Sequence, residues 1–181
     1  MLTIERTPIA MGDTVGSSEL QEHMRLDADL VDGAVAYVKA ASAEVEAYCN
    51  IALLDQTVTA LSDTFPDTSL ALPVGPVAAD ATITVELQET DGTYTAVTDG
   101  WFLQAGLFPK LHFASTPGGR MRVTYPAGYG DTSTDIPADL RLAICDLSAR
   151  LYDYRASDKT ATMPAATARI CARYRKVKVG A

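Results

Sequence analysis

Apolar residues at helical spacing dominate the first 50 positions of the chain. Ser17 and Ser18 are candidate helix caps, so a short helix is predicted over about residues 18–25. A longer helix is predicted over about residues 28–49, although Gly33 weakens its first turn by about 1 kcal/mol relative to alanine. Its apolar stripe consists of Val31, Ala34, Val35, Val38, Ala41, Val45, Tyr48 and Cys49.

Residues 53–125 change to the alternation of apolar and polar residues that is typical of strands. The segments "TVTALSDTF" and "ATITVELQE" alternate over most of their length. Asp91 and Gly92 supply the positive φ angles that a tight hairpin turn needs. Glycine and proline separate the other apolar segments. We therefore expect a small antiparallel sheet or sandwich of about five to seven short strands.

A third helix is predicted over about residues 136–155. Pro137 suits a first helical turn, and Asp139 suits the positive end of the helix dipole. One apolar stripe consists of Leu140, Ala143, Ile144, Leu147, Leu151 and Tyr154. A second apolar strip beside it consists of Leu142, Cys145, Ala149 and Tyr152. A helix with so narrow a polar face either lies at the centre of the core or turns its second strip toward another subunit.

The end of the chain is first polar and then basic. Residues 158–168 are small and polar with one proline, which predicts a flexible linker. The following C-terminal arm, Arg169 to Lys178, has five basic residues and no acid. The net charge of the protein is −8, and without these five residues 10 basic residues stand against 23 acidic ones, a net charge of −13. An acidic protein with a basic arm indicates that the arm has an acidic partner of its own.

Together these patterns predict an α+β protein. Two N-terminal helices and a C-terminal helix would form a small bundle, with an inserted antiparallel β section and an extended C-terminal arm. Residues 1–157 would form one domain and residues 158–181 the linker and arm. The arm has few apolar side chains, so we expect it to be disordered or extended in the isolated protein.

Composition excludes several environments. No apolar run approaches the roughly 18 to 20 residues that span a bilayer, and we expect no secretory signal. The three cysteines, Cys49, Cys145 and Cys171, are widely spaced and odd in number. They therefore favour a reducing cytosol over a disulfide framework, and their spacing excludes a metal knuckle.

No pattern in the chain predicts catalysis. The stretch "AGYGD", Ala127 to Asp131, lacks the spacing of a phosphate-binding or dinucleotide loop, so we interpret Gly128 and Gly130 as turn residues. His23 and His112 have no partner that the sequence identifies, and Cys145 is interpreted as a small apolar residue. We expect no catalytic residue, no metal and no cofactor.

Five stretches, in order, resemble the head–tail connector (adaptor) proteins of tailed phages. They are "SSELQEHMRLD", "AEVEAYCNIALLDQTV", "LPVGPV", "VTYPAGYGDTSTDIPADLRLAICDLSARLYDYR" and "MPAATARICARYRKVKV". The turn "AGYG", the helix start "IP" and the ending "LYxxR" are the most specific parts. Tyr154 and Arg155 depart from the more usual ending, an acidic residue followed by Asn-Arg.

The resemblance implies a structural role in the virion. Such adaptors form rings, commonly of twelve copies, under the portal at the head–tail interface, after synthesis in the cytoplasm of the bacterial host. Their partners are the portal protein, neighbouring copies and the next tail-side connector or stopper, with no membrane. DNA passes through the channel without specific binding, which suits an acidic protein.

The resemblance also assigns two surfaces. The portal-binding arm would comprise Arg169, Ile170, Arg173, Tyr174, Arg175, Lys176 and Lys178. The second apolar strip, Leu142, Cys145, Ala149 and Tyr152, would meet a neighbouring subunit. The free protein could be monomeric until a portal templates the ring.

Two other classes of function stay open. A small nucleic-acid-binding module could use the same basic arm on phosphates, but the acidic remainder of the chain weighs against it. A small enzyme with histidine or cysteine chemistry would need a constellation that the sequence lacks. Ring number, tail type and host stay open, as does the choice between a virus, a prophage remnant and a gene transfer particle.

Overall fold

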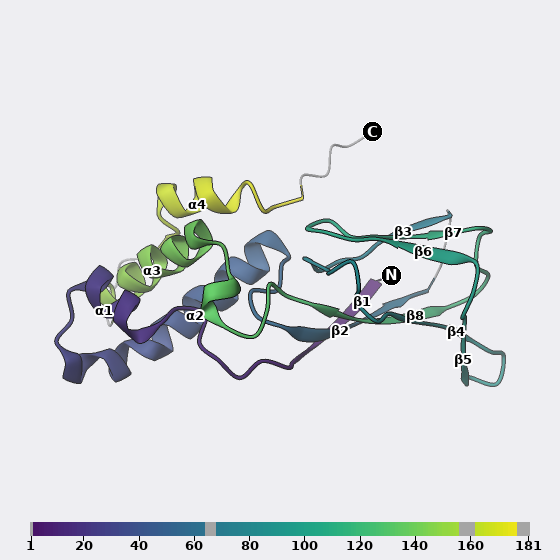
Figure 1. The fold of residues 1–181 in the computed structure, drawn as a ribbon, viewed down its shortest axis with the longest axis horizontal. Helices are drawn as coiled ribbons and strands as arrows, with labels where there is room; N and C mark the ends of the chain where they lie inside the picture. Colours follow the sequence, from purple (N-terminus) through teal and green to yellow (C-terminus); the bar gives the residue numbers. More distant parts are fainter. Residues whose placement is uncertain (1, 64–67, 156–161, 177–181) are drawn as a thin grey trace. The chain divides into compact units, whose positions relative to one another are not determined.

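The computed structural model describes residues 2–63, 68–155 and 162–176 and combines helices with antiparallel sheets (Figure 1). The chain divides into two compact units. The β unit comprises Met1–Ile9 and Asp55–Tyr129, and the helical unit comprises Ala10–Leu54 and Gly130–Ala181. The predicted α+β class, with a β section inserted between the second and third helices, is confirmed. The expected domain boundary at residue 157 lies outside the described residues.

The three predicted helices are present in the helical unit. The helical elements are α1 (Ser17–Met24), η1 (Ala28–Leu30), α2 (Val31–Cys49), η2 (Ser133–Asp135), α3 (Ala138–Asp153) and α4 (Ala165–Cys171). Helices α1, α2 and α3 begin and end within a few residues of the prediction. Pro137 precedes α3 rather than lying in its first turn, because its ψ of 134° is extended. No helix among the described residues is long and apolar enough to cross a membrane.

The core of the helical unit lies between α2 and α3, which pack against each other and against α1. Six of the eight residues of the predicted α2 stripe are buried, and Val35 and Tyr48 are half-buried. Leu140, Ile144 and Leu147 of α3 are fully buried. The helical periodicity of the sequence therefore predicted correctly which face of each helix is buried.

The β unit contains two sheets. Its strands are β1 (Leu2–Pro8), β2 (Gln56–Ser62), β3 (Ser69–Ala71), β4 (Thr84–Gln88), β5 (Tyr94–Ala96), β6 (Trp101–Gln104), β7 (Lys110–Phe113) and β8 (Met121–Ala127). The larger sheet has the order β1-β2-β8-β4-β5, and the smaller one has the order β3-β7-β6. The sequence did not predict β1, which pairs along its whole length with β2.

Alternation fixes the inward face of the larger sheet. On β2, Val58 and Ala60 are buried while their neighbours are half-buried, and on β8 the buried residues are Met121, Val123, Tyr125 and Ala127. The register places Val58 opposite Tyr125 and Ala60 opposite Val123. The hydroxyl of Tyr125 donates to the carbonyl oxygen of Val74 at 3.2 Å, which satisfies the only polar atom of this buried side chain.

The glycines of the "AGYG" segment are turn residues, as predicted. Gly128 has a φ of 154° and Gly130 a φ of 150°. A side chain at Gly128 would also clash, because an added Cβ would lie 2.6 Å from the Cα of Asp55. Backbone geometry and close approach, rather than phosphate binding, therefore explain both glycines.

Gly128→Ala should lower the free energy of unfolding by about 2 kcal/mol or more, since strain and overlap with backbone act together. Gly33→Ala is the matched control. Gly33 lies inside α2 and an added Cβ there would meet nothing within 4 Å, so this change should raise the stability by up to about 1 kcal/mol. Urea denaturation of both variants measures the difference. Equal stabilities would contradict the role given to Gly128.

Candidate functional site

The C-terminal arm is not extended over its described part, which corrects the prediction. Residues Ala165–Cys171 form α4, which packs on α3 and also contacts α2. Thr167, Ile170 and Cys171 are buried there. The arm has too little apolar area to fold alone, but α2 and α3 supply the surface that covers it. The predicted linker accordingly ends before α4, and residues 156–161 lie outside the described residues.

Asp139 in the first turn of α3 anchors the segment that follows α4. A guanidinium nitrogen of Arg173 lies 2.8 Å from Asp139 Oδ2, and the hydroxyl of Tyr174 donates to Asp139 Oδ1 at 2.7 Å. The backbone N–H of Leu140 also donates to Oδ1 at 3.0 Å. Charge-assisted hydrogen bonds of this kind are roughly twice as strong as neutral ones. The sequence assigned Asp139 only to the helix dipole, because nothing in the local pattern identifies a partner 34 residues away.

The predicted portal-binding residues divide into two groups. Ile170 is buried, Arg173 and Tyr174 are bound to Asp139, and the guanidinium of Arg175 lies over the ring of Tyr48, 5.0 Å from its centre. Arg169 and Lys176 are exposed and have no such contact among the described residues, whereas Arg173 and Arg175 are exposed but make one. Lys178 lies outside the described residues. The first group positions the arm on the helical unit, and the second is turned to solvent.

A surface hollow of about 290 Å³ lies beside α4. The described residues that line it are Arg169, Ile170 and Arg173. Arg169 could offer its guanidinium to a carboxylate there, whereas the guanidinium of Arg173 is already bound to Asp139. The hollow therefore gives the arm a shaped, basic surface.

The second apolar strip of α3 is only partly available to a neighbour. Cys145 is buried inside the helical unit, so its assignment to a subunit interface is wrong for this fold. Tyr152 is half-buried and makes an edge-to-face contact with Tyr37, with 5.4 Å between ring centres, and Ala149 is also half-buried. Leu142 is 46% exposed. Leu142 is thus the member of the strip with the most area to offer another subunit.

Cys49 and Cys145 have the properties of core residues. Burial raises the pKa of the Cys145 thiol to about 12, and the carboxylates of Glu19 and Asp146 act in the same direction. The pKa of Cys49 is also raised, because its thiol donates a hydrogen bond to Cys171 and is buried. A thiol needs a lowered pKa to act as a nucleophile near neutral pH. Neither Cys49 nor Cys145 meets that condition.

The histidines lie in structural contacts. His23 on α1 lies 3.0 Å from a carboxylate oxygen of Asp146 on α3, so this pair links two helices. His112 on β7 stacks on Phe102 with 4.8 Å between ring centres and contacts Gln104 at 3.0 Å. No nucleophile lies beside either ring in these contacts.

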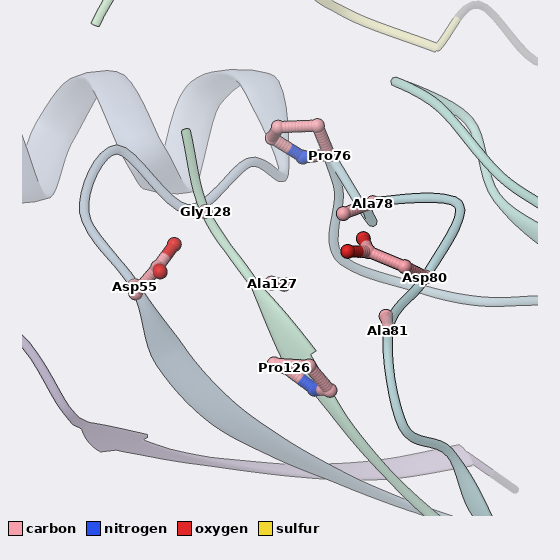
Figure 2. Close-up of a pocket in the computed structure, with 8 residues that line it drawn as sticks. All are labelled: Asp55, Pro76, Ala78, Asp80, Ala81, Pro126, Ala127 and Gly128. Carbon is pink, nitrogen blue, oxygen red and sulfur yellow. The ribbon is translucent and has the colours of Figure 1, made fainter. Parts of the chain in front are cut away.

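A second hollow, of about 210 Å³, lies in the β unit (Figure 2). Its polar side chains are Asp55 and Asp80, which Figure 2 shows at its two sides. The other lining residues are Pro76, Ala78, Ala81, Pro126, Ala127 and Gly128. Two carboxylates among small apolar residues make neither an acid–base site nor a metal site on their own. The described residues contain no group of three or more potential metal ligands.

Comparisons with known proteins agree with this picture. The family model of the head completion protein matches residues 17–177. A chain in the neck of an empty gene transfer agent particle, computed with C6 symmetry, is similar with a TM-score of 0.81 and 26% identity; the match covers 98% of this chain and 97% of that one. Chains from the virion of a native gene transfer agent particle and from the neck of the native particle computed with C12 symmetry have TM-scores of 0.81 and 0.77. Both are 27% identical and have the same coverage. Comparison with curated proteins gives no match.

The fold, the family match and the similarity to particle-neck chains place this chain in the class of structural head–tail connectors of phage-like particles. The chain belongs to the head completion protein family. The connector role predicted from the sequence is thereby confirmed.

Proposed function

We propose that this protein forms a ring under the portal of a phage-like particle, joins head to tail and extends the DNA channel without catalysing a reaction. One observation carries the proposal: over 98% of its length the chain matches a chain in a particle neck computed with C12 symmetry. That symmetry supports a ring of about twelve copies, and the similar neck computed with C6 symmetry is compatible with this number. The host cytoplasm would hold the protein before assembly, and a tail-side connector or stopper would bind the ring afterwards.

The charge of the chain supports a conduit rather than a DNA-binding protein. Residues 1–168 have a net charge of −13, which opposes binding of the phosphate backbone. DNA must move through a connector, so a surface that binds phosphates tightly would impede it. The acidic remainder and the basic arm therefore have different partners.

We assign portal binding to the exposed side of the arm. Arg169 and Lys176 face solvent, while the contacts of Arg173 and Tyr174 with Asp139 hold the arm in place. A pre-ordered arm loses less conformational entropy on docking than a disordered one does. Carboxylates on the portal would enter the hollow beside Arg169 and Arg173.

The double variant Arg169→Glu, Lys176→Glu should bind portal-bearing heads at least about tenfold more weakly, because attraction to portal carboxylates becomes repulsion. Its thermal stability should match that of the wild type, since both side chains face solvent. Sedimentation of heads with labelled protein measures binding. The matched control is Arg25→Glu, Lys39→Glu, which makes the same charge change at the end of α1 and on α2.

The same variants test the alternative that the arm binds nucleic acid. That function requires salt-sensitive binding of the wild type to any duplex, weakened in step with the charges removed. Unchanged head binding by Arg169→Glu, Lys176→Glu would contradict the portal assignment. Duplex binding by the wild type that this variant loses would favour the nucleic-acid function instead.

A further inference from the structure

The larger sheet of the β unit ends in an open strand. β1 pairs with β2 on one side, and on its other side no strand follows among the described residues. Six of its seven residues are exposed. Exposed edges invite pairing with another chain, and natural proteins usually protect them.

The hydrogen-bond pattern shows which residues of β1 face outward. Ile9 donates its N–H to the carbonyl oxygen of Asp55, and these two residues are opposite each other in the continued β1–β2 register. In an antiparallel pair, hydrogen-bonded and non-bonded positions alternate. Thr3, Glu5 and Thr7 therefore bond to β2. The backbone groups of the even-numbered residues point away from β2, and these residues are Leu2, Ile4, Arg6 and Pro8.

Proline at the last outward position is consistent with this pattern. Pro8 has no N–H, and at this position none is needed for the β2 ladder. Pro8 also limits strand pairing at one end of the edge. The N–H groups of Leu2 and Ile4 point outward and have no acceptor among the described residues.

The side chains of the sheet form rows that run across all five strands. The register aligns Ile4, Ala60, Val123, Val85 and the residue after β5, Val97, in one row. Ala60, Val123 and Val85 are buried at the centre of the row. The adjacent row begins at Leu2 and ends at Thr95.

The ends of these rows are exposed. Ile4 is 42% exposed and Leu2 39% exposed, and Thr95 at the opposite edge is exposed as well. The apolar face of the sheet therefore continues to its β1 edge without cover. A strand added there would bury both side chains and extend the row.

We propose that β1 of one copy pairs with β5 of the next copy, so that the larger sheets continue from subunit to subunit around the ring. This proposal rests on the ring of the proposed function and names one of its contacts. A closed ring needs two different, complementary surfaces on each copy. The two unlike edges of this sheet supply such surfaces.

Strand direction supports this junction. Each neighbouring pair in the order β1-β2-β8-β4-β5 is antiparallel, so β1 and β5 run in the same direction. A rotation axis along the strands preserves direction from copy to copy, and the new pair is therefore parallel. On β5, Val97 and Thr93 bond to β4, which leaves the backbone of Tyr94 and Ala96 facing outward. Two outward residues of β5 thus meet the outward N–H groups of β1.

Proline substitution gives a sharp test, because it removes one N–H at a chosen side of β1. Ile4→Pro removes an outward N–H and should keep the melting temperature within about 3 °C of the wild type. It should reduce the amount of protein retained in portal-bound rings by about tenfold or more. Ile4→Ala retains the N–H and should assemble much better than Ile4→Pro. Thr3→Pro removes a β2 bond and should lower the melting temperature clearly.

Cross-linking identifies the neighbouring strand. In the portal-bound assembly, the double variant Ile4→Cys, Thr95→Cys should give a ladder of multimers with a short bismaleimide, because both positions lie on the same face of the continued sheet. Ile4→Cys, Ser69→Cys, with the second substitution on β3, should give no ladder. A ladder from this control alone would overturn the β5 assignment.

The outcomes separate this proposal from the function on which it rests. The wild type and Ile4→Pro could form rings equally well while the double variant Ile4→Cys, Thr95→Cys gives no ladder. That result would overturn the sheet junction, but the ring of the proposed function would stand. A wild type that forms no ring on the portal would overturn the proposed function and the junction with it.

Discussion

Leu142→Glu should abolish ring assembly and leave the fold intact. Leu142 is 46% exposed on α3, so a charge there should change the free energy of unfolding by less than about 1 kcal/mol. In a subunit interface the same carboxylate would be buried without a partner, at a cost of several kcal/mol for each contact. Because every contact of a ring repeats that cost, assembly should fail completely. Native mass spectrometry of the protein with its portal measures the loss.

Leu30→Glu is the matched control for this prediction. Leu30 is 45% exposed and belongs to the same helical unit, but it lies outside the second apolar strip of α3. The Leu30→Glu variant should therefore assemble like the wild type. Tyr152→Glu is less informative than Leu142→Glu, because Tyr152 also packs against Tyr37 within the chain. Normal rings from Leu142→Glu would show that this part of α3 does not face a neighbour.

A chain that ends at Ser157 should lose attachment to portal-bearing heads and also lose stability. It lacks α4, so the surfaces of α2 and α3 that cover Ile170 and Cys171 become exposed, and Asp139 loses Arg173 and Tyr174. Lost burial and lost charge-assisted hydrogen bonds together should cost about 3 to 5 kcal/mol. Urea denaturation and head sedimentation measure the two effects separately.

Asp139→Asn separates anchoring from stability in the full-length chain. It removes the charge that holds Arg173 and should cost about 1 to 2 kcal/mol, while α4 stays present. Amide hydrogen exchange should become faster in residues 165–176 and stay unchanged in α1.

Normal attachment to heads by the chain that ends at Ser157 would show that the arm is not the portal-binding element.

Elements with a local sequence signal were predicted correctly. The stripes of α2 and α3 repeat every three to four residues, and a helix buries whatever face such a stripe defines. The alternation of apolar and polar residues predicted β2 and β4, because successive side chains of a strand point to opposite faces of the sheet. Gly128 and Gly130 were identified correctly as turn residues because positive φ angles select glycine. The resemblance to head–tail connectors also rested on the order in which these local patterns follow one another along the chain.

Features that depend on distant partners could not be predicted from local patterns and became visible only in the folded chain. β1 is a strand because β2 lies beside it, although Leu2 and Ser62 are 60 positions apart in the sequence. α4 has seven residues, too few to be stable alone, and it folds because α3 and α2 cover Ile170 and Cys171. The described part of the C-terminal arm therefore packs on the helical unit, although the composition of the arm predicts an extended chain. Asp139 becomes its anchor through a contact that no local periodicity encodes.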